Sequence, residues 1–111
     1  MIKFSVFYPW APGCWFDTKY YCERHIAPYR ADPLVKGIIV ESGKSTRDFQ
    51  SPPRYACIAH FFYDSEETLH ESRSPERVAR QIEDNVNFTN IKGFNLVSRM
   101  PYLDLERMGG R

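Results

Sequence analysis

The chain lacks most of the features that identify a class of protein directly. It has three cysteines, Cys14, Cys22 and Cys57, an odd number without CxxC spacing. This argues against a disulfide framework and a structural zinc site and favours a reducing compartment. No apolar stretch approaches the roughly 20 residues needed to cross a bilayer, and no signal-peptide pattern precedes the first predicted strand. The sequence therefore predicts a cytoplasmic protein without a membrane partner.

An excess of charge and the common nucleotide and metal motifs are also missing. The 15 basic residues are scattered among 14 acidic ones, for a net charge of +1, so no basic stripe would attract nucleic acid. There is no glycine-rich phosphate loop, no serine nucleophile elbow and no HExxH pattern. We therefore expect no nucleic-acid partner, no metal and no organic cofactor.

What the chain does have is aromatic residues, at 15% of the sequence, and a regular alternation of predicted elements. In chain order these elements are a strand over 2–8, a helix from 17 to about 25 or beyond, strands over 35–43 and 55–63, a second helical region in two pieces that start near 65 and at 75, and a strand over 93–99. The order is that of the ferredoxin-like split βαβ fold. The fold class is thus α+β, with one antiparallel sheet and both helices on one face. This domain covers residues 1–100, followed by a tail or arm over 101–111.

Two helix starts are marked by capping residues. Asp17 is placed to cap the first helix, a structural role that we favour over an acid. The second helix begins at either Asp64 or Ser65, and with Asp64 as the cap Glu67 falls at the capping-box position. Pro75 suits the first turn of the next helix.

The third predicted strand, YACIAHFFY over 55–63, is apolar on both faces. Two helices cover only one face of the sheet, and a free antiparallel face normally alternates apolar with polar residues. A second apolar face needs a partner, and the simplest partner is another copy of the chain. The sequence predicts a homodimer that forms through the sheet.

The segment PWAPGCWFDTKYYCERHIAP, residues 9–28, resembles the EthD family, whose members carry a PG-containing loop followed by FDxxYYxxxH. YACIAHFFYDS and EDNVNFTNI extend the resemblance in the same order along the chain. It implies a dimeric α/β barrel, a link to ethyl tert-butyl ether degradation beside a cytochrome P450 system, and kinship with cofactor-free enzymes that cyclise, dehydrate or decarboxylate their substrates. The chain departs from the family in placing Pro28 one residue later after His25, and in running past the usual end.

His25, Tyr21 and His60 are the candidate catalytic residues. His25 follows Tyr21 by four residues, so both lie on one helix face, where the imidazole could act as base or acid and the Tyr hydroxyl could orient a substrate. A structural histidine at a helix end explains the same spacing. His60, in the middle of the apolar strand, needs a partner or a cavity. It is either a pocket residue or a satisfied histidine of the core or dimer interface.

Four aromatic residues, Tyr8, Trp10, Phe62 and Phe88, are candidates for ligand contact, with core packing as the alternative. We expect structural roles for Asp84, Asn87 and Thr89, and a solvent-facing His70. The joint hypothesis is that His25 and His60 border one pocket on the dimer-facing side of the sheet. That pocket would hold a small, largely apolar molecule of an oxidative degradation pathway acting on an ether or aromatic compound. The alternatives are a cofactor-independent cyclase, dehydratase or decarboxylase and a non-catalytic accessory or structural dimer.

Overall fold

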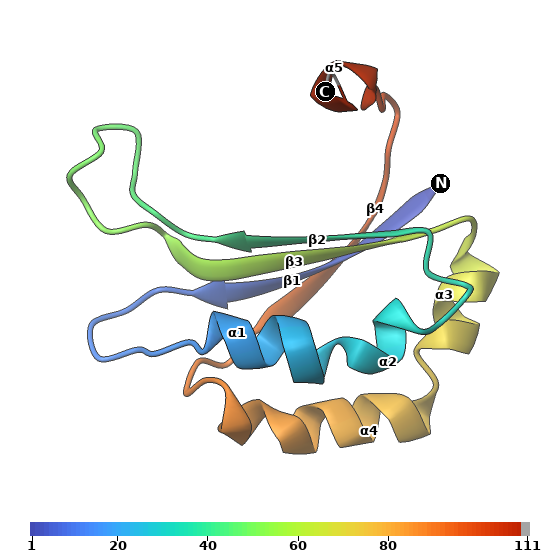
Figure 1. The fold of residues 1–111 in the computed structure, drawn as a ribbon, viewed down its shortest axis with the longest axis horizontal. Helices are drawn as coiled ribbons and strands as arrows, with labels where there is room; N and C mark the ends of the chain where they lie inside the picture. Colours follow the sequence, from blue (N-terminus) through green and yellow to red (C-terminus); the bar gives the residue numbers. More distant parts are fainter. Residues whose placement is uncertain (110–111) are drawn as a thin grey trace.

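The computed structural model describes residues 1–109. Its elements, in chain order, are β1 (Ile2–Pro9), α1 (Thr18–Tyr20), η1 (Tyr21–His25), α2 (Ala27–Arg30), β2 (Gly37–Ser42), β3 (Tyr55–Tyr63), α3 (Glu66–Ser72), α4 (Pro75–Asp84), η2 (Asn85–Asn87), β4 (Phe94–Arg99) and α5 (Glu106–Gly109). The strands form one sheet in the order β2-β3-β1-β4, and every neighbouring pair is antiparallel. Helices α1 to α4 lie on one side of this sheet (Figure 1). The predicted ferredoxin-like α+β fold is confirmed, with the two aromatic-rich strands at the centre.

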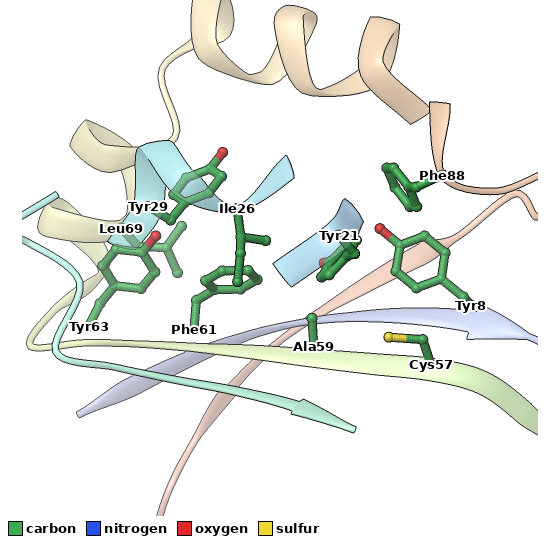
Figure 2. Close-up of a cluster of buried hydrophobic side chains, with 10 residues drawn as sticks. All are labelled: Tyr8, Tyr21, Ile26, Tyr29, Cys57, Ala59, Phe61, Tyr63, Leu69 and Phe88. Atoms are coloured by element: carbon green, nitrogen blue, oxygen red, sulfur yellow. The ribbon is translucent and has the colours of Figure 1, made fainter. Parts of the chain in front are cut away.

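The register of the central strands decides which side chains face the helices. Phe4 lies opposite Phe61 and Val6 opposite Ala59, whereas Ser5 lies opposite His60. Because side chains alternate along a strand, the first two pairs share one face and the third pair lies on the other. The buried core gathers on the helix face, where rings from both the sheet and the helices point toward one another (Figure 2).

None of the helices α1 to α4 lies over the opposite face of the sheet (Figure 1). Ile58 and Phe62 of β3 lie on it, together with the exposed side chains Ile39, Phe94 and Leu96 of the two edge strands. Leu96 is 50% exposed and Phe94 is 48% exposed. We call this surface the open face. The prediction that the second face is apolar and uncovered by the protomer's own helices holds.

The first helix has an irregular centre. Asp17 accepts a hydrogen bond from the Tyr20 amide and so caps it, as predicted. One turn later the chain forms the π-helical segment η1, in which the Ile26 amide donates to the Tyr21 carbonyl at 3.1 Å. The helix then continues beyond His25 as α2, which ends at Arg30. Because a π turn holds one more residue than an α turn, η1 can absorb the additional residue between His25 and Pro28.

The second helix begins at the second of the two candidate caps. The Ser65 hydroxyl accepts from the Thr68 amide at 3.2 Å, and the Thr68 hydroxyl accepts from the Ser65 amide. This reciprocal pair is a capping box built on Ser65, so the arrangement with Asp64 and Glu67 is not the one formed. Ser74 caps α4 in the same way, with Pro75 in its first turn.

The C-terminal segment leaves the layered body after β4. The expected tail over 101–111 contains the short helix α5, which lies on the side of the sheet away from the other helices (Figure 1). Residues 110 and 111 of that tail lie outside the described part of the chain. Among the described residues, no helix is long and apolar enough to span a membrane.

Candidate functional site

A cavity of about 370 Å³ lies between the helix face of the sheet and the helices above it. Its floor is formed by β1, β3 and β4, and its walls by η1, α2, α3 and α4. Most of the lining is aromatic or aliphatic, with Phe4, Tyr8, Phe61 and Val97 from the strands. Ile82 and Val97 line it while remaining half or more exposed, so the cavity opens between α4 and β4. Its size falls in the range of small-molecule sites, about 300–1,000 Å³.

His25 enters this cavity from the π turn. The imidazole is 6% exposed, stacks on Tyr21 with 5.0 Å between ring centroids, and contacts Phe88 at 4.4 Å. Its Nδ1 lies 2.8 Å from Asp84 Oδ2 at the end of α4. We assign the proton to Nδ1, which donates to this carboxylate, so that the lone pair is on Nε2.

The charge state of the pair follows from its surroundings. Burial lowers the pKa of His25 below 6.5, and Asp84 opposes this only in part. Burial alone would raise the pKa of Asp84, but hydrogen bonds from Tyr20, Asn87 and His25 outweigh it and hold the pKa below 3.8. At neutral pH the pair is therefore a neutral imidazole fixed in orientation by a carboxylate. Such an imidazole can accept a proton at Nε2.

Two tyrosines lie beside His25. Burial raises the pKa of Tyr8 to about 12, although a hydrogen bond with Tyr21 works in the opposite direction. Burial also raises the pKa of Tyr21 well above 10. Both phenols line the cavity and stay protonated at neutral pH. The hydrogen bond between them uses one of the two phenolic protons, which leaves one hydroxyl free to donate to an oxygen atom of a bound molecule.

Arg73, the residue after α3, contributes a positive charge to the cavity. Its guanidinium carbon lies 3.8 Å from the ring centre of Phe4, 4.3 Å from that of Tyr29 and 4.6 Å from that of Phe61. Nη1 donates to the Tyr29 hydroxyl at 3.3 Å. Nε and Nη2 are buried and have no hydrogen-bond partner among the described residues.

His60 lies on the opposite side of the sheet from His25. Its Nδ1 is 2.7 Å from Ser5 Oγ, and its Nε2 is 2.7 Å from Glu41 Oε1. Those three side chains form a row across β1, β3 and β2 on the open face. The hypothesis that the two histidines border one pocket is therefore wrong, because strand alternation turns His60 away from the helices. Of the two readings of His60, this geometry gives a histidine satisfied by its own protomer.

The other sequence candidates separate in the same way. Tyr8 and Tyr21 do meet His25 in the cavity. Phe88 is fully buried behind His25 and packs against both tyrosines (Figure 2). Phe62 shares the open face with His60, opposite Lys3 and Gly37.

Trp10 follows β1 on the surface, where its amide donates to the Arg54 carbonyl. His70 is exposed as expected but also reaches the cavity lining.

Two residues of the cavity region were not predicted as site residues. Asp84 was expected to be structural, although it lies within the matched segment EDNVNFTNI, the one signal that could have indicated it. Nothing in the sequence around Arg73 indicates a site residue, because its neighbours along the chain are polar. Only the fold brings its guanidinium over three aromatic rings. Among the described residues no group of three or more His, Cys, Asp or Glu side chains is placed to hold a metal ion.

Comparison with known proteins identifies the fold and its relatives. No protein-family model matches the chain, and neither does any curated protein. An EthD-like protein from Ralstonia eutropha JMP134 is similar, with 28% identity over 96% of both chains and a TM-score of 0.83. An EthD family protein from Bacillus halodurans C-125 is 14% identical, with a TM-score of 0.68 over 89% of this chain and 97% of that one. An antibiotic biosynthesis monooxygenase, 12% identical, has a TM-score of 0.51 over 92% of this chain and 100% of that one.

The first of these structures combines sequence identity above 25% with nearly complete coverage, whereas the other two, both below 25% identity, show a shared fold alone. The resemblance seen in the segments around FDTKYYCERH, YACIAHFFYDS and EDNVNFTNI is confirmed, and the chain is EthD-like in sequence and in fold.

Proposed function

We propose that each protomer binds a small, largely apolar organic molecule in the cavity between the sheet and the helices. The observation that carries this proposal is the cavity itself: about 370 Å³, open between α4 and β4, and lined mainly by aromatic and aliphatic side chains. A few polar groups, His25, Tyr8 and Tyr21 among them, converge on it, as is usual in ligand sites.

The proposal includes a homodimer in which two open faces pack together. Leu96, Phe94 and Ile39 expose apolar surface on one continuous side of the sheet. The likeness to proteins of the dimeric α/β barrel fold supports this arrangement. A role in oxidative degradation of an ether or aromatic compound, in the cytoplasm, belongs to the same proposal. Its support is the EthD-like sequence, since the likeness to the monooxygenase shows the fold alone.

A matched pair of valine variants tests the cavity. Val97 lies on β4 opposite Phe4 and lines the cavity, whereas Val86 on η2 is 75% exposed and lies outside its lining. The probe is the neutral 2-naphthamide, and calorimetry measures its binding. We expect Val97→Trp to weaken binding by about tenfold or more, because the indole occupies the volume of the probe. Val86→Trp should bind like the unaltered protein. Equal affinity of all three proteins, or no binding to any, would contradict the proposal.

The second candidate function is a cofactor-independent enzyme of the cyclase, dehydratase or decarboxylase type. The observation that favours it is the pair His25–Asp84, joined at 2.8 Å beside two protonated tyrosines. The neutral Nε2 would remove a proton, and the phenolic hydroxyl left free by the hydrogen bond between the two tyrosines would stabilise the oxygen that gains charge. Its test is deuterium exchange next to the carbonyl group of aromatic ketones, followed by NMR. Exchange that is faster with the unaltered protein than in buffer, and that His25→Gln abolishes, would support an enzyme. Exchange at the buffer rate with the unaltered protein would contradict the enzyme and leave ligand binding as the only proposed function.

A further inference from the structure

We infer that the cavity selects ligands carrying a carboxylate or a similar anionic oxygen group, which pairs with Arg73 in the lining of a mainly apolar site. This inference rests on the proposed ligand cavity and specifies its substrate class. Three observations carry it: the position of Arg73 in the lining, the two nitrogens without partners, and the lack of an acidic side chain among the described lining residues.

The charge of Arg73 is not neutralised within the described part of the chain. Arginine stays protonated in proteins, and burying such a charge is costly without an opposite partner. The three rings around the guanidinium offset this cost in part through cation–π contacts. The Tyr29 hydroxyl accepts one hydrogen bond. Nε and Nη2 still lack acceptors.

A neighbouring arginine shows the difference clearly. Arg77 of α4 also lies over the ring of Tyr29, at 5.3 Å, but its Nη1 lies 2.8 Å from the Asp32 carboxylate. The Ser72 hydroxyl donates to the same carboxylate at 2.7 Å. The acidic group in this region is thus already paired with Arg77. Arg73 is the cation left for an incoming ligand.

The remaining lining suits such a ligand. Aromatic and aliphatic side chains, Phe4 and Val97 among them, line the cavity beside Arg73 and provide apolar contacts for its body. A carboxylate fits the planar guanidinium and accepts two parallel hydrogen bonds from it. Tyr8, Tyr21 and His25 lie along the same cavity, so an anionic group held at Arg73 would place the rest of the molecule beside His25. The positive charge of Arg73 also contributes to the lowered pKa of His25, after burial, which is the main cause.

The test compares 2-naphthoate with 2-naphthamide, which share a ring system and differ in charge. Calorimetry at pH 7.5 measures both against the unaltered protein, Arg73→Met and Arg77→Met. We expect 2-naphthoate to bind the unaltered protein about tenfold more tightly than the amide. Arg73→Met should reduce this ratio to about one while still binding the amide. Arg77→Met should keep the preference for 2-naphthoate. Any loss of stability in this variant would come from the lost ion pair between Arg77 and Asp32.

Equal binding of the two probes to the unaltered protein, or a preference that survives in Arg73→Met, would overturn the inference while the ligand cavity stands. If neither 2-naphthoate nor 2-naphthamide binds the unaltered protein, the proposed function itself is overturned. A second readout covers the case in which Arg73→Met does not fold. Binding of 2-naphthoate places a negative charge near His25 and should raise its imidazole pKa in an NMR titration, and 2-naphthamide should not. An unchanged His25 titration with bound 2-naphthoate would count against the pairing.

Discussion

At the scale of single residues, the pair His25–Asp84 is the feature on which the proposed chemistry depends. The imidazole is buried between Tyr21 and Phe88, and Asp84 is held by Tyr20, Asn87 and His25 together. A histidine fixed in this way presents one defined nitrogen to the cavity. The same spacing along a free helix would leave the ring with several rotamers.

Asp84→Asn tests whether the carboxylate sets the charge state of His25. Because Asp84 favours the charged imidazole, its removal should lower the pKa of His25 further, as measured by NMR of the ring protons. We also expect the free energy of unfolding to fall by about 1–3 kcal/mol, since buried hydrogen bonds are lost. Asp64→Asn is the control, because Asp64 is exposed and lies 3.9 Å from Lys36. A His25 pKa that does not change would contradict the assigned pairing.

The burial of His25 also predicts how stability depends on pH. Its folded pKa lies below the unfolded value of 6.5, so below pH 6.5 the unfolded chain binds more protons than the folded one. Stability should therefore be highest above pH 6.5 and decrease as the pH falls through the folded pKa. Thermal melts between pH 7.5 and 5 would show this as a falling Tm, and His25→Gln should flatten the curve. An identical pH dependence in both proteins would refute the prediction.

At the scale of elements, the π turn η1 is what directs His25 into the cavity. Tyr21 and His25 are both buried, and Ile26 immediately after them is buried too. A straight α-helix would rotate one of these three away from the sheet, since 3.6 residues complete each of its turns. The wider turn keeps all three on the inner side. Such turns are often found at functional sites.

The start of α3 offers a stability test of the capping residue. Ser65→Ala removes the half of the capping box in which the Ser65 hydroxyl accepts from the Thr68 amide, and should lower the free energy of unfolding by about 1 kcal/mol. Asp64→Ala is the matched control, because Asp64 does not cap α3 in the structure. The free energy of unfolding of this variant should lie within about 0.5 kcal/mol of that of the unaltered protein. Denaturant titrations measure both. A larger loss in Asp64→Ala than in Ser65→Ala would reverse the assignment.

At the scale of the whole molecule, one sheet separates two surfaces with different roles. The helix face holds the core and the ligand cavity. The open face holds the row Ser5–His60–Glu41 among apolar neighbours. Both nitrogens of His60 have partners in that row, so the face can be covered by a second copy without leaving an unsatisfied imidazole.

Replacing Leu96 by lysine tests the pairing of open faces. Leu96 lies on β4, opposite Ser5 of β1, and its side chain is half exposed. A lysine there would have to be buried in the interface, so we expect Leu96→Lys to sediment near the 13.1 kDa chain mass at micromolar concentration. Val86→Lys changes an exposed valine on η2 and should leave the dimer intact. If the unaltered protein is itself a monomer, or if Leu96→Lys still dimerises, the arrangement is wrong.

The sequence by itself determined the fold, because its evidence is local. Alternation in IKFSVFY and YACIAHFFY, the cap at Asp17 and the proline breaks each depend on a few neighbouring residues. The order of the elements then left one arrangement of strands. The resemblance around FDTKYYCERH indicated the relatives, and it placed His25 and Tyr21 on one helix face.

Only the tertiary structure decided which of the candidates meet. His25 and His60 look equivalent along the chain, but one enters from a helix above the sheet and the other points below it. Asp84 and Arg73 are far in sequence from His25 and Phe4, so contact with them arises only when α3 and α4 pack on the sheet. Periodicity tells which face a residue occupies on its own element. Periodicity does not show which side chains of other elements will contact that face, because those contacts depend on packing between segments distant in the chain.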